Sequence, residues 1–124
     1  MTTKDNLKAA FAGESQAHRK YTAFSRKAEK EGFNQIARVF RAVAEAETVH
    51  ALNHLDLLGE VKSTLENLKA AQAGEEYEYT DMYPKFIEEA DQEGQEETAK
   101  SFRMAFEREK HHRAMFRQAL KKFI

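Results

Sequence analysis

The sequence predicts an all-α fold, a four-helix bundle made from a duplicated pair of helices. Three observations lead to this prediction. Apolar residues recur every three or four positions, the 124 residues include one proline, and the second half of the chain repeats the first. Such spacing is typical of helices that bury one face in a bundle. The length fits a single domain over residues 1–124.

Three glycine-containing breaks separate the expected helices. Gly32, Gly59 and Gly94 each follow a helical pattern, as a C-terminal glycine does, and a new pattern starts a few residues later. Asn34 is a possible N-cap of the second helix. We expect helices at about 4–30, 34–58, 64–92 and 95–122, which form helix pairs at about 4–58 and 64–122.

The two helix pairs resemble each other residue by residue. Residues 5–14 align with residues 66–75 at an offset of 61, and the second helix aligns with the fourth at an offset of 62. Two copies are too few for a solenoid. A duplicated helix pair therefore implies a bundle with pseudo-twofold symmetry.

Each expected helix carries a glutamate near the centre of its apolar face, where leucine would be usual. No lysine or arginine falls on these faces. Burying one unpaired carboxylate costs several kcal/mol, so the glutamates must be protonated or neutralised by metal ions. The four central residues are Glu14, Glu47, Glu75 and Glu109.

Two Glu-x-x-His motifs favour metal. At a spacing of three residues on a helix, Glu47 and His50 share one face and can hold the same ion, and the fourth helix repeats this with Glu109 and His112. Two such motifs, with one glutamate from each of the other helices, make up the ligand set of ferritin-like di-iron and di-manganese bundles. Carboxylate and imidazole ligands suit iron or manganese and do not exclude zinc.

These motifs resemble the ferritin-like domain of the rubrerythrin family over nearly the whole chain. The matching segments are residues 12–17, Glu47 with His50, residues 74–78 running into 82–84, and Glu109 with His112. The resemblance implies a ferritin-like four-helix bundle with two iron ions, or alternatively a mixed iron–zinc pair or manganese. The implied metal ligands are Glu14, Glu47, His50, Glu75, Glu78, Glu109 and His112.

The resemblance also assigns roles. Glu78 aligns with Ala17, so the second half has an extra carboxylate, which is a hallmark of the family. One iron is expected to move between Glu78 in the oxidised state and His50 in the reduced state. The resemblance further implies that Glu47 and Glu109 bridge the two irons. Glu14 is expected to bind the first iron, and Glu75 with His112 the second. Tyr21 and Tyr83 are expected to donate hydrogen bonds to ligating carboxylates.

The activity implied by the resemblance is that of a peroxidase-type oxidoreductase, which reduces hydrogen peroxide to water. Full-length rubrerythrins carry a rubredoxin-like domain with four cysteines, whereas this sequence has none. The chain thus resembles the single-domain, sulerythrin-like members or a shortened rubrerythrin, and we expect electrons from an external donor such as a rubredoxin-like protein. The alternatives are a ferroxidase or oxygen-reducing iron-handling protein, and a redox-silent metal-binding bundle.

Charge and hydropathy argue against other classes of function. A net charge of −1 gives no electrostatic reason to bind nucleic acid or an anionic membrane. No apolar segment is long enough to span a bilayer, and the N-terminus lacks the apolar region of a signal peptide. The absence of cysteine excludes disulfides and iron–sulfur clusters. The expected location is the cytoplasm.

The short middle connection predicts a domain-swapped homodimer. In ferritin-like bundles the second and third helices are parallel, and here the connection would have to cross about 33 Å at 1.5 Å per residue. The loop from Gly59 to Ser63 reaches at most roughly 18 Å. We therefore expect helices one and two of one copy to pack on helices three and four of another.

Two further residues carry expectations. His54, one turn beyond His50, is expected to be a buried or capping histidine rather than a ligand. Pro84 is expected to kink the third helix near the metal site, because proline removes one helical hydrogen bond.

Overall fold

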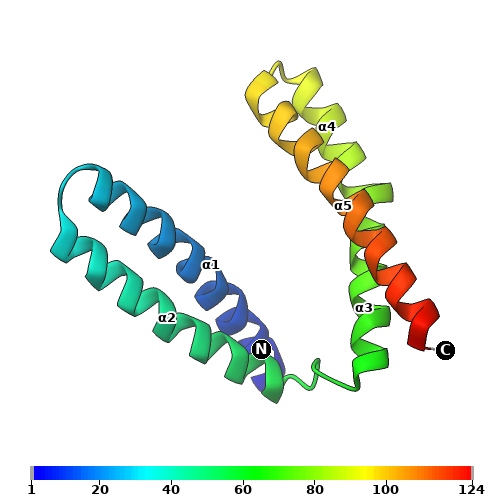
Figure 1. Ribbon diagram of the computed structural model, residues 1–124, viewed down its shortest axis with the longest axis horizontal. Helices are drawn as coiled ribbons and strands as arrows, with labels where there is room; N and C mark the ends of the chain where they lie inside the picture. Colours follow the sequence, from blue (N-terminus) through cyan, green and yellow to red (C-terminus); the bar gives the residue numbers. More distant parts are fainter. Residues whose placement is uncertain (1, 124) are drawn as a thin grey trace. The chain divides into compact units, whose positions relative to one another are not determined.

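The computed structural model describes residues 2–123 and confirms the all-α prediction, since no strand occurs in that range (Figure 1). The chain divides between Val61 and Lys62 into two compact units, and each is an antiparallel helical hairpin. We call them the N-terminal and C-terminal hairpins. The helices are α1 (Thr3–Lys30), α2 (Asn34–Leu57), α3 (Thr64–Tyr77), η1, a π-helix (Glu78–Met82), α4 (Tyr83–Gln92) and α5 (Glu96–Phe123).

Two of the expected helix boundaries need correction. The third helix, expected to be α-helical over residues 64–92, is interrupted by η1, which ends at Met82, and Pro84 lies in the first turn of α4. The kink expected near Pro84 stays a prediction, and the structure adds a π-helix before it. Asn34 is the first residue of α2 rather than its N-cap. The N-cap is Phe33, which makes no side-chain capping bond.

Both hairpins turn with the same backbone motif. In the first, Gly32 has a φ of +84°, Gly32 N–H donates to Glu29 O at 3.0 Å, and Phe33 N–H donates to Ala28 O at 2.8 Å. The second turn repeats these two bonds around Gly94, which has a φ of +69°. This is the Schellman arrangement, and its left-handed position favours glycine because glycine has no Cβ.

Small residues lie where the helices of each hairpin approach most closely. Ala37, Ala44 and Ala51 recur every seven residues along α2 and are buried against α1. Ala99 and Ala90 are likewise buried in the C-terminal hairpin. Helix separation depends on the side chains at the contact, and alanine allows a short separation.

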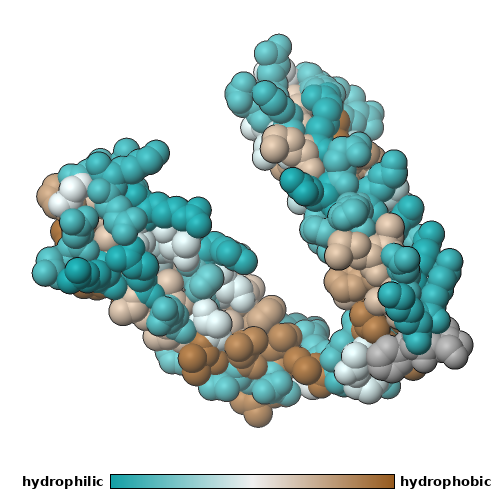
Figure 2. Space-filling model, viewed as in Figure 1, coloured by the Kyte–Doolittle hydropathy of each residue, from teal (hydrophilic) through white to brown (hydrophobic). Residues whose placement is uncertain are grey.

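Larger apolar side chains remain open to solvent in the N-terminal hairpin. Ile36 is 51% exposed and Val43 is 40% exposed, although both lie on the apolar face of α2. Figure 2 also shows apolar atoms at the surface of α2 toward its C-terminal end, where Leu52 and Leu57 are exposed. Contiguous exposed apolar faces of this kind are typical of interaction surfaces.

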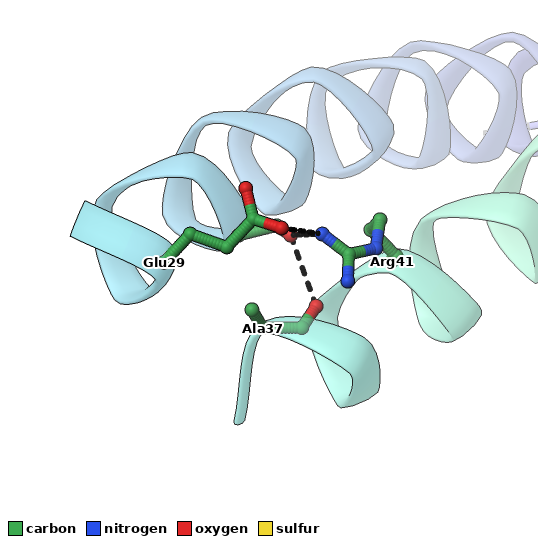
Figure 3. Close-up of polar contacts among 4 residues, drawn as sticks. Glu29, Ala37 and Arg41 are labelled. Carbon is green, nitrogen blue, oxygen red and sulfur yellow. Dashed lines mark hydrogen bonds and ion pairs between the residues drawn. The ribbon is translucent and has the colours of Figure 1, made fainter. Parts of the chain in front are cut away.

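A network of hydrogen bonds joins the two helices of the N-terminal hairpin near its turn (Figure 3). The buried Ser25 hydroxyl donates to Ala37 O at 2.9 Å, and Arg41 Nη1 donates to Ser25 Oγ at 3.2 Å and to Glu29 Oε1 at 2.7 Å. In the C-terminal hairpin Arg103 Nη2 donates to Asp91 Oδ2 at 2.6 Å. The arginines and the carboxylates occupy equivalent repeat positions.

No helix within residues 2–123 is both long enough and apolar enough to cross a membrane.

Candidate metal centre

The N-terminal hairpin brings three of the predicted ligands together. One potential ligand atom from each of Glu14, Glu47 and His50 lies within 4.8 Å of the other two. Glu14 projects from α1 and the other two residues from α2, where the three-residue spacing places them on one face. Glu14 Oε1 is 3.4 Å from His50 Nδ1.

The C-terminal hairpin repeats this half-site. Ligand atoms of Glu75, Glu109 and His112 also lie within 4.8 Å of one another. His112 Nδ1 is 3.6 Å from Glu75 Oε1 and 3.7 Å from Glu109 Oε1. The same residue types thus converge at equivalent repeat positions in both hairpins.

Glu78, at the start of η1, joins the C-terminal half-site through Glu109. The hydrogen bond between the two carboxyl groups raises the pKa of Glu78 to about 7, and burial and repulsion by Glu109 add to the shift. The pKa of Glu109 is also raised. Its bond to Glu78 lowers that pKa, but a hydrogen bond with Glu75, burial and the Glu75 charge together outweigh this effect. Without a cation, Glu78 and Glu109 therefore bind protons more readily than isolated carboxyl groups do.

The donor atoms of both half-sites fit a transition-metal ion. Glu75 Oε2 is buried without a hydrogen-bond partner among the described residues, which is unfavourable for a carboxylate oxygen. Ligand atoms on opposite sides of a metal with bonds of about 2.1 Å are about 4.2 Å apart, which is compatible with the convergence within 4.8 Å. Carboxylate and imidazole donors are those that bind iron, manganese or zinc.

The π-helix marks a one-residue insertion in the second repeat. The repeat offset is 61 at Glu14 and Glu75, but 62 at Tyr21 and Tyr83, so the extra residue lies between Glu75 and Tyr83. η1, at residues 78–82, occupies this interval, whereas α1 continues without interruption through the matching segment. Single π-turns within α-helices are frequent at functional sites. The change in offset was a signal of η1 already present in the sequence.

A family model for rubrerythrin matches residues 5–120. The chain belongs to the rubrerythrin family. It is 45% identical to the rubrerythrin of Porphyromonas gingivalis, over 89% of this chain and 62% of that protein. It is 41% identical to the nigerythrin of Nitratidesulfovibrio vulgaris, over 84% of this chain and 58% of that protein. The chain thus spans about three-fifths of the length of these two relatives.

Solved structures of nigerythrin have the same fold. The fully reduced, all-ferrous nigerythrin matches this chain with a TM-score of 0.51 at 37% identity, over 99% of this chain and 68% of that one. The partially reduced state also gives a TM-score of 0.51. The predicted ferritin-like fold class and the predicted resemblance to rubrerythrins are therefore confirmed. Domain swapping stays a prediction.

The two tyrosines expected beside the metal ligands lie in aromatic clusters of this rubrerythrin-family fold. The Tyr21 ring is 6.1 Å from that of Phe40, and the Tyr83 ring is 6.0 Å from that of Phe102. Burial, followed by the charges of nearby carboxylates led by Glu109, raises the pKa of Tyr83. Neither hydroxyl makes a hydrogen bond within residues 2–123, so hydrogen bonding to ligands stays a prediction for both.

His54 has a contact that sequence reasoning missed. Its side chain is half-buried and faces Glu14 rather than capping α2, with Nε2 at 2.7 Å from Glu14 Oε2. The available signal was its place one turn beyond His50 on the apolar face of the helix. Phe116 occupies the equivalent position in the C-terminal hairpin.

Proposed function

We propose that this chain forms a di-iron centre that reduces hydrogen peroxide to water with electrons from an external donor. The observation that carries the proposal is the pairing of Glu78, the carboxylate without a counterpart in the first repeat, with Glu109 of a metal half-site. A metal-storing or structural bundle would have no need of this extra ionisable ligand.

The proposed centre combines the two half-sites. Glu14 would hold the first metal and Glu75 with His112 the second, while Glu47 and Glu109 would bridge the two. Membership of the rubrerythrin family and likeness to a nigerythrin structure described as all ferrous support iron. A mixed iron–zinc pair or manganese is the alternative that metal analysis of the protein would reveal.

Glu78 and His50 would provide the proton and ligand chemistry. Reduction of one peroxide to two waters consumes two electrons and two protons, and the metal pair, when bound, supplies the electrons. In the metal-free protein the pKa of Glu78 is raised to about 7, so this carboxyl group can hold a proton near neutral pH when no cation is bound to it. We propose that Glu78 would release this proton when it becomes an anionic ligand. Exchange of the neutral His50 for the anionic Glu78 would offset the additional positive charge of the oxidised centre.

The electrons must reach the centre from outside these residues. The 124 residues contain no cysteine, so they include no rubredoxin-like iron site. We propose a separate donor site, such as that of a rubredoxin-like protein.

We further propose that the half-sites combine between two copies of the chain. From Glu47 to Leu57 and from Thr64 to Glu75, the helices span about 32 Å in total at about 1.5 Å per residue. The chain between Leu57 and Thr64 reaches at most about 25 Å at roughly 3.5 Å per residue. A capping box between Ser63 and Glu66 stabilises the start of α3, so no helical turn is available to lengthen the connection.

Light scattering of the metal-loaded protein tests this assembly. We expect a dimer that holds two metals per chain, which means two complete centres. A monomer with two metals per chain would contradict the domain swap and leave the peroxidase proposal standing.

Stopped-flow spectroscopy of the anaerobic, iron-loaded, reduced protein tests the activity. We expect hydrogen peroxide to oxidise the centre orders of magnitude faster than dissolved oxygen. If oxygen reacts as fast or faster, the chain is a ferroxidase or an oxygen-reducing enzyme, and the proposed role of Glu78 is wrong.

A further inference from the structure

His54 contacts one of the two oxygens of Glu14, while the other faces the metal half-site. Glu14 Oε1 is 3.4 Å from His50 Nδ1, and Glu14 Oε2 is 2.7 Å from His54 Nε2. The second distance is the shortest between a histidine and a carboxylate within the described part of the chain. Each oxygen of Glu14 therefore has a different neighbour on α2.

The contact is short enough for a hydrogen bond, although the ring is not aligned for one. Glu14 Oε2 and His54 Nδ1 are both buried without a hydrogen-bond partner among residues 2–123. The terminal torsion of histidine is soft, so a modest rotation of the imidazole directs its N–H at the oxygen. This rotation would satisfy the carboxylate oxygen, which is otherwise an unpaired buried acceptor.

His54 is placed to hold Glu14 rather than to bind the metal itself. The ligand atoms that converge within 4.8 Å in this hairpin belong to Glu14, Glu47 and His50, and His54 is not a member of that group. Its nearest ionisable partner is the carboxylate oxygen that faces away from His50. A histidine in this position acts on the metal through the ligand that it orients.

The C-terminal hairpin has no histidine at the position equivalent to His54. Phe116 occupies the repeat position of His54, and a phenyl ring cannot donate a hydrogen bond. The oxygen of Glu75 that matches Glu14 Oε2 is buried without a partner. Glu75 instead shares a hydrogen bond with Glu109. The two repeats thus hold their equivalent glutamates by different means.

We propose that His54 is a positioning residue that fixes the orientation of Glu14 at the N-terminal metal position. This inference rests on the proposed function, in which His50 leaves this metal position when the centre is oxidised. Glu14 is then the ligand that must stay in place while its neighbour exchanges. A hydrogen bond from His54 keeps its second oxygen from swinging toward the metal, so Glu14 keeps one binding mode in both states.

Cobalt(II) titration of the metal-free protein, residues 1–124, under anaerobic conditions tests the proposal. We compare the wild type with His54→Phe, which copies the C-terminal hairpin, and with His54→Gln, whose amide N–H can still donate. Loss of an outer hydrogen bond to a ligand weakens metal binding by roughly 10-fold or more. We expect this loss at one of the two metals in His54→Phe, with an altered cobalt visible spectrum, and recovery of most of the affinity in His54→Gln.

Phe116→Leu is the matched control, because it alters the equivalent site on α5 without removing a donor. It should bind both metals as the wild type does. Two unchanged affinities and an unchanged cobalt spectrum in His54→Phe would overturn the proposal, as would equal losses in His54→Phe and His54→Gln. If His54→Phe does not fold by circular dichroism, His54→Leu takes its place.

The titration contains no peroxide, so it separates this inference from the proposed function. A wild type that binds two metals and reacts slowly with peroxide would contradict the peroxidase proposal alone. Normal peroxide reactivity together with normal metal binding by His54→Phe would contradict the role of His54 alone.

Discussion

The two hairpins have the same architecture, yet the residues around the metal half-site differ between them. Both have the same Schellman turn, buried alanines between their helices and an arginine–carboxylate pair near the turn. Both also gather two glutamates and a histidine at equivalent positions. The features that define the scaffold and the metal ligands are therefore those that the duplication preserved.

The differences lie around the ligands. The C-terminal hairpin adds Glu78 and the π-helix that begins with it, where the N-terminal hairpin has Ala17 in a continuous α-helix. The N-terminal hairpin adds His54 against Glu14, where its counterpart has Phe116. One half thus gains an extra carboxylate and the other gains a group that holds a carboxylate. A duplicated scaffold can acquire an asymmetric reaction centre through a few such changes.

The largest expected effect comes from breaking the feature that both hairpins share. Glu47→Ala and Glu109→Ala each remove a proposed bridging ligand, so each should lose tight binding of at least one of the two metals. Metal content after anaerobic loading, measured by mass spectrometry, checks this. Glu45→Ala and Glu107→Ala are matched controls, since both glutamates are exposed and related by the repeat. Full metal content in either bridging variant would contradict the assigned ligand set.

Removal of the carboxylate that only one hairpin has should affect the reaction more than metal binding. Glu78→Ala is expected to retain both metals and to slow oxidation by peroxide by about 100-fold, the lower range for loss of a proton-transferring group. Stopped-flow rates at saturating iron measure the effect. Glu76→Ala alters a neighbouring glutamate that pairs with Arg113 and Arg117, outside the half-site, and serves as the control. An unchanged rate in Glu78→Ala would remove Glu78 from the mechanism.

Deletion of one residue from the π-helix should make the hairpins more alike. Asp81 is exposed, and its removal gives the two repeats a uniform offset, so we expect α-helix in place of η1, with one hydrogen bond still missing at Pro84. The protein should fold with wild-type helix content by circular dichroism and bind two metals, because the equivalent segment of α1 does without the extra residue. Loss of folding would show that η1 is needed for packing and is not a tolerated insertion.

The smallest effect concerns the stability of the metal-free protein against pH. The pKa of Glu78 rises from an ordinary 4.5 to about 7 in the folded state, so between these values the folded protein holds a proton that the unfolded chain has lost. The stabilisation is fully present below about pH 4.5 and is lost as the pH rises through about 7.

Thermal unfolding of the wild type and of Glu78→Gln at pH 5.5 and pH 8 measures this contribution. The glutamine variant does not titrate at this position, so the stability of the wild type relative to the variant should fall between the lower and the higher pH. A constant difference between the two proteins would contradict the raised pKa.

The sequence by itself determined the helices and the central ligands of the two half-sites. Glu47 and His50 share a helix face because of their three-residue spacing, which is a local property of any α-helix. The ends of α1 and α2 lie within one residue of the expected ends, because Gly32 and Gly59 stop each helix through backbone conformation alone. Because the two repeats align, the same spacing predicts that Glu109 and His112 share a helix face.

Only the tertiary structure decided how the neighbours of those ligands are used. The pairing of Glu78 with Glu109, and of His54 with Glu14, joins residues on different helices, and hydrogen-bonding distances between helices do not follow from periodicity. The repeat offset locates an extra residue, but its accommodation as a π-helix depends on how α3 and α4 each keep their own contacts with α5. Spacing along one helix fixes which side chains share a face, whereas packing between helices fixes the partners that those side chains meet.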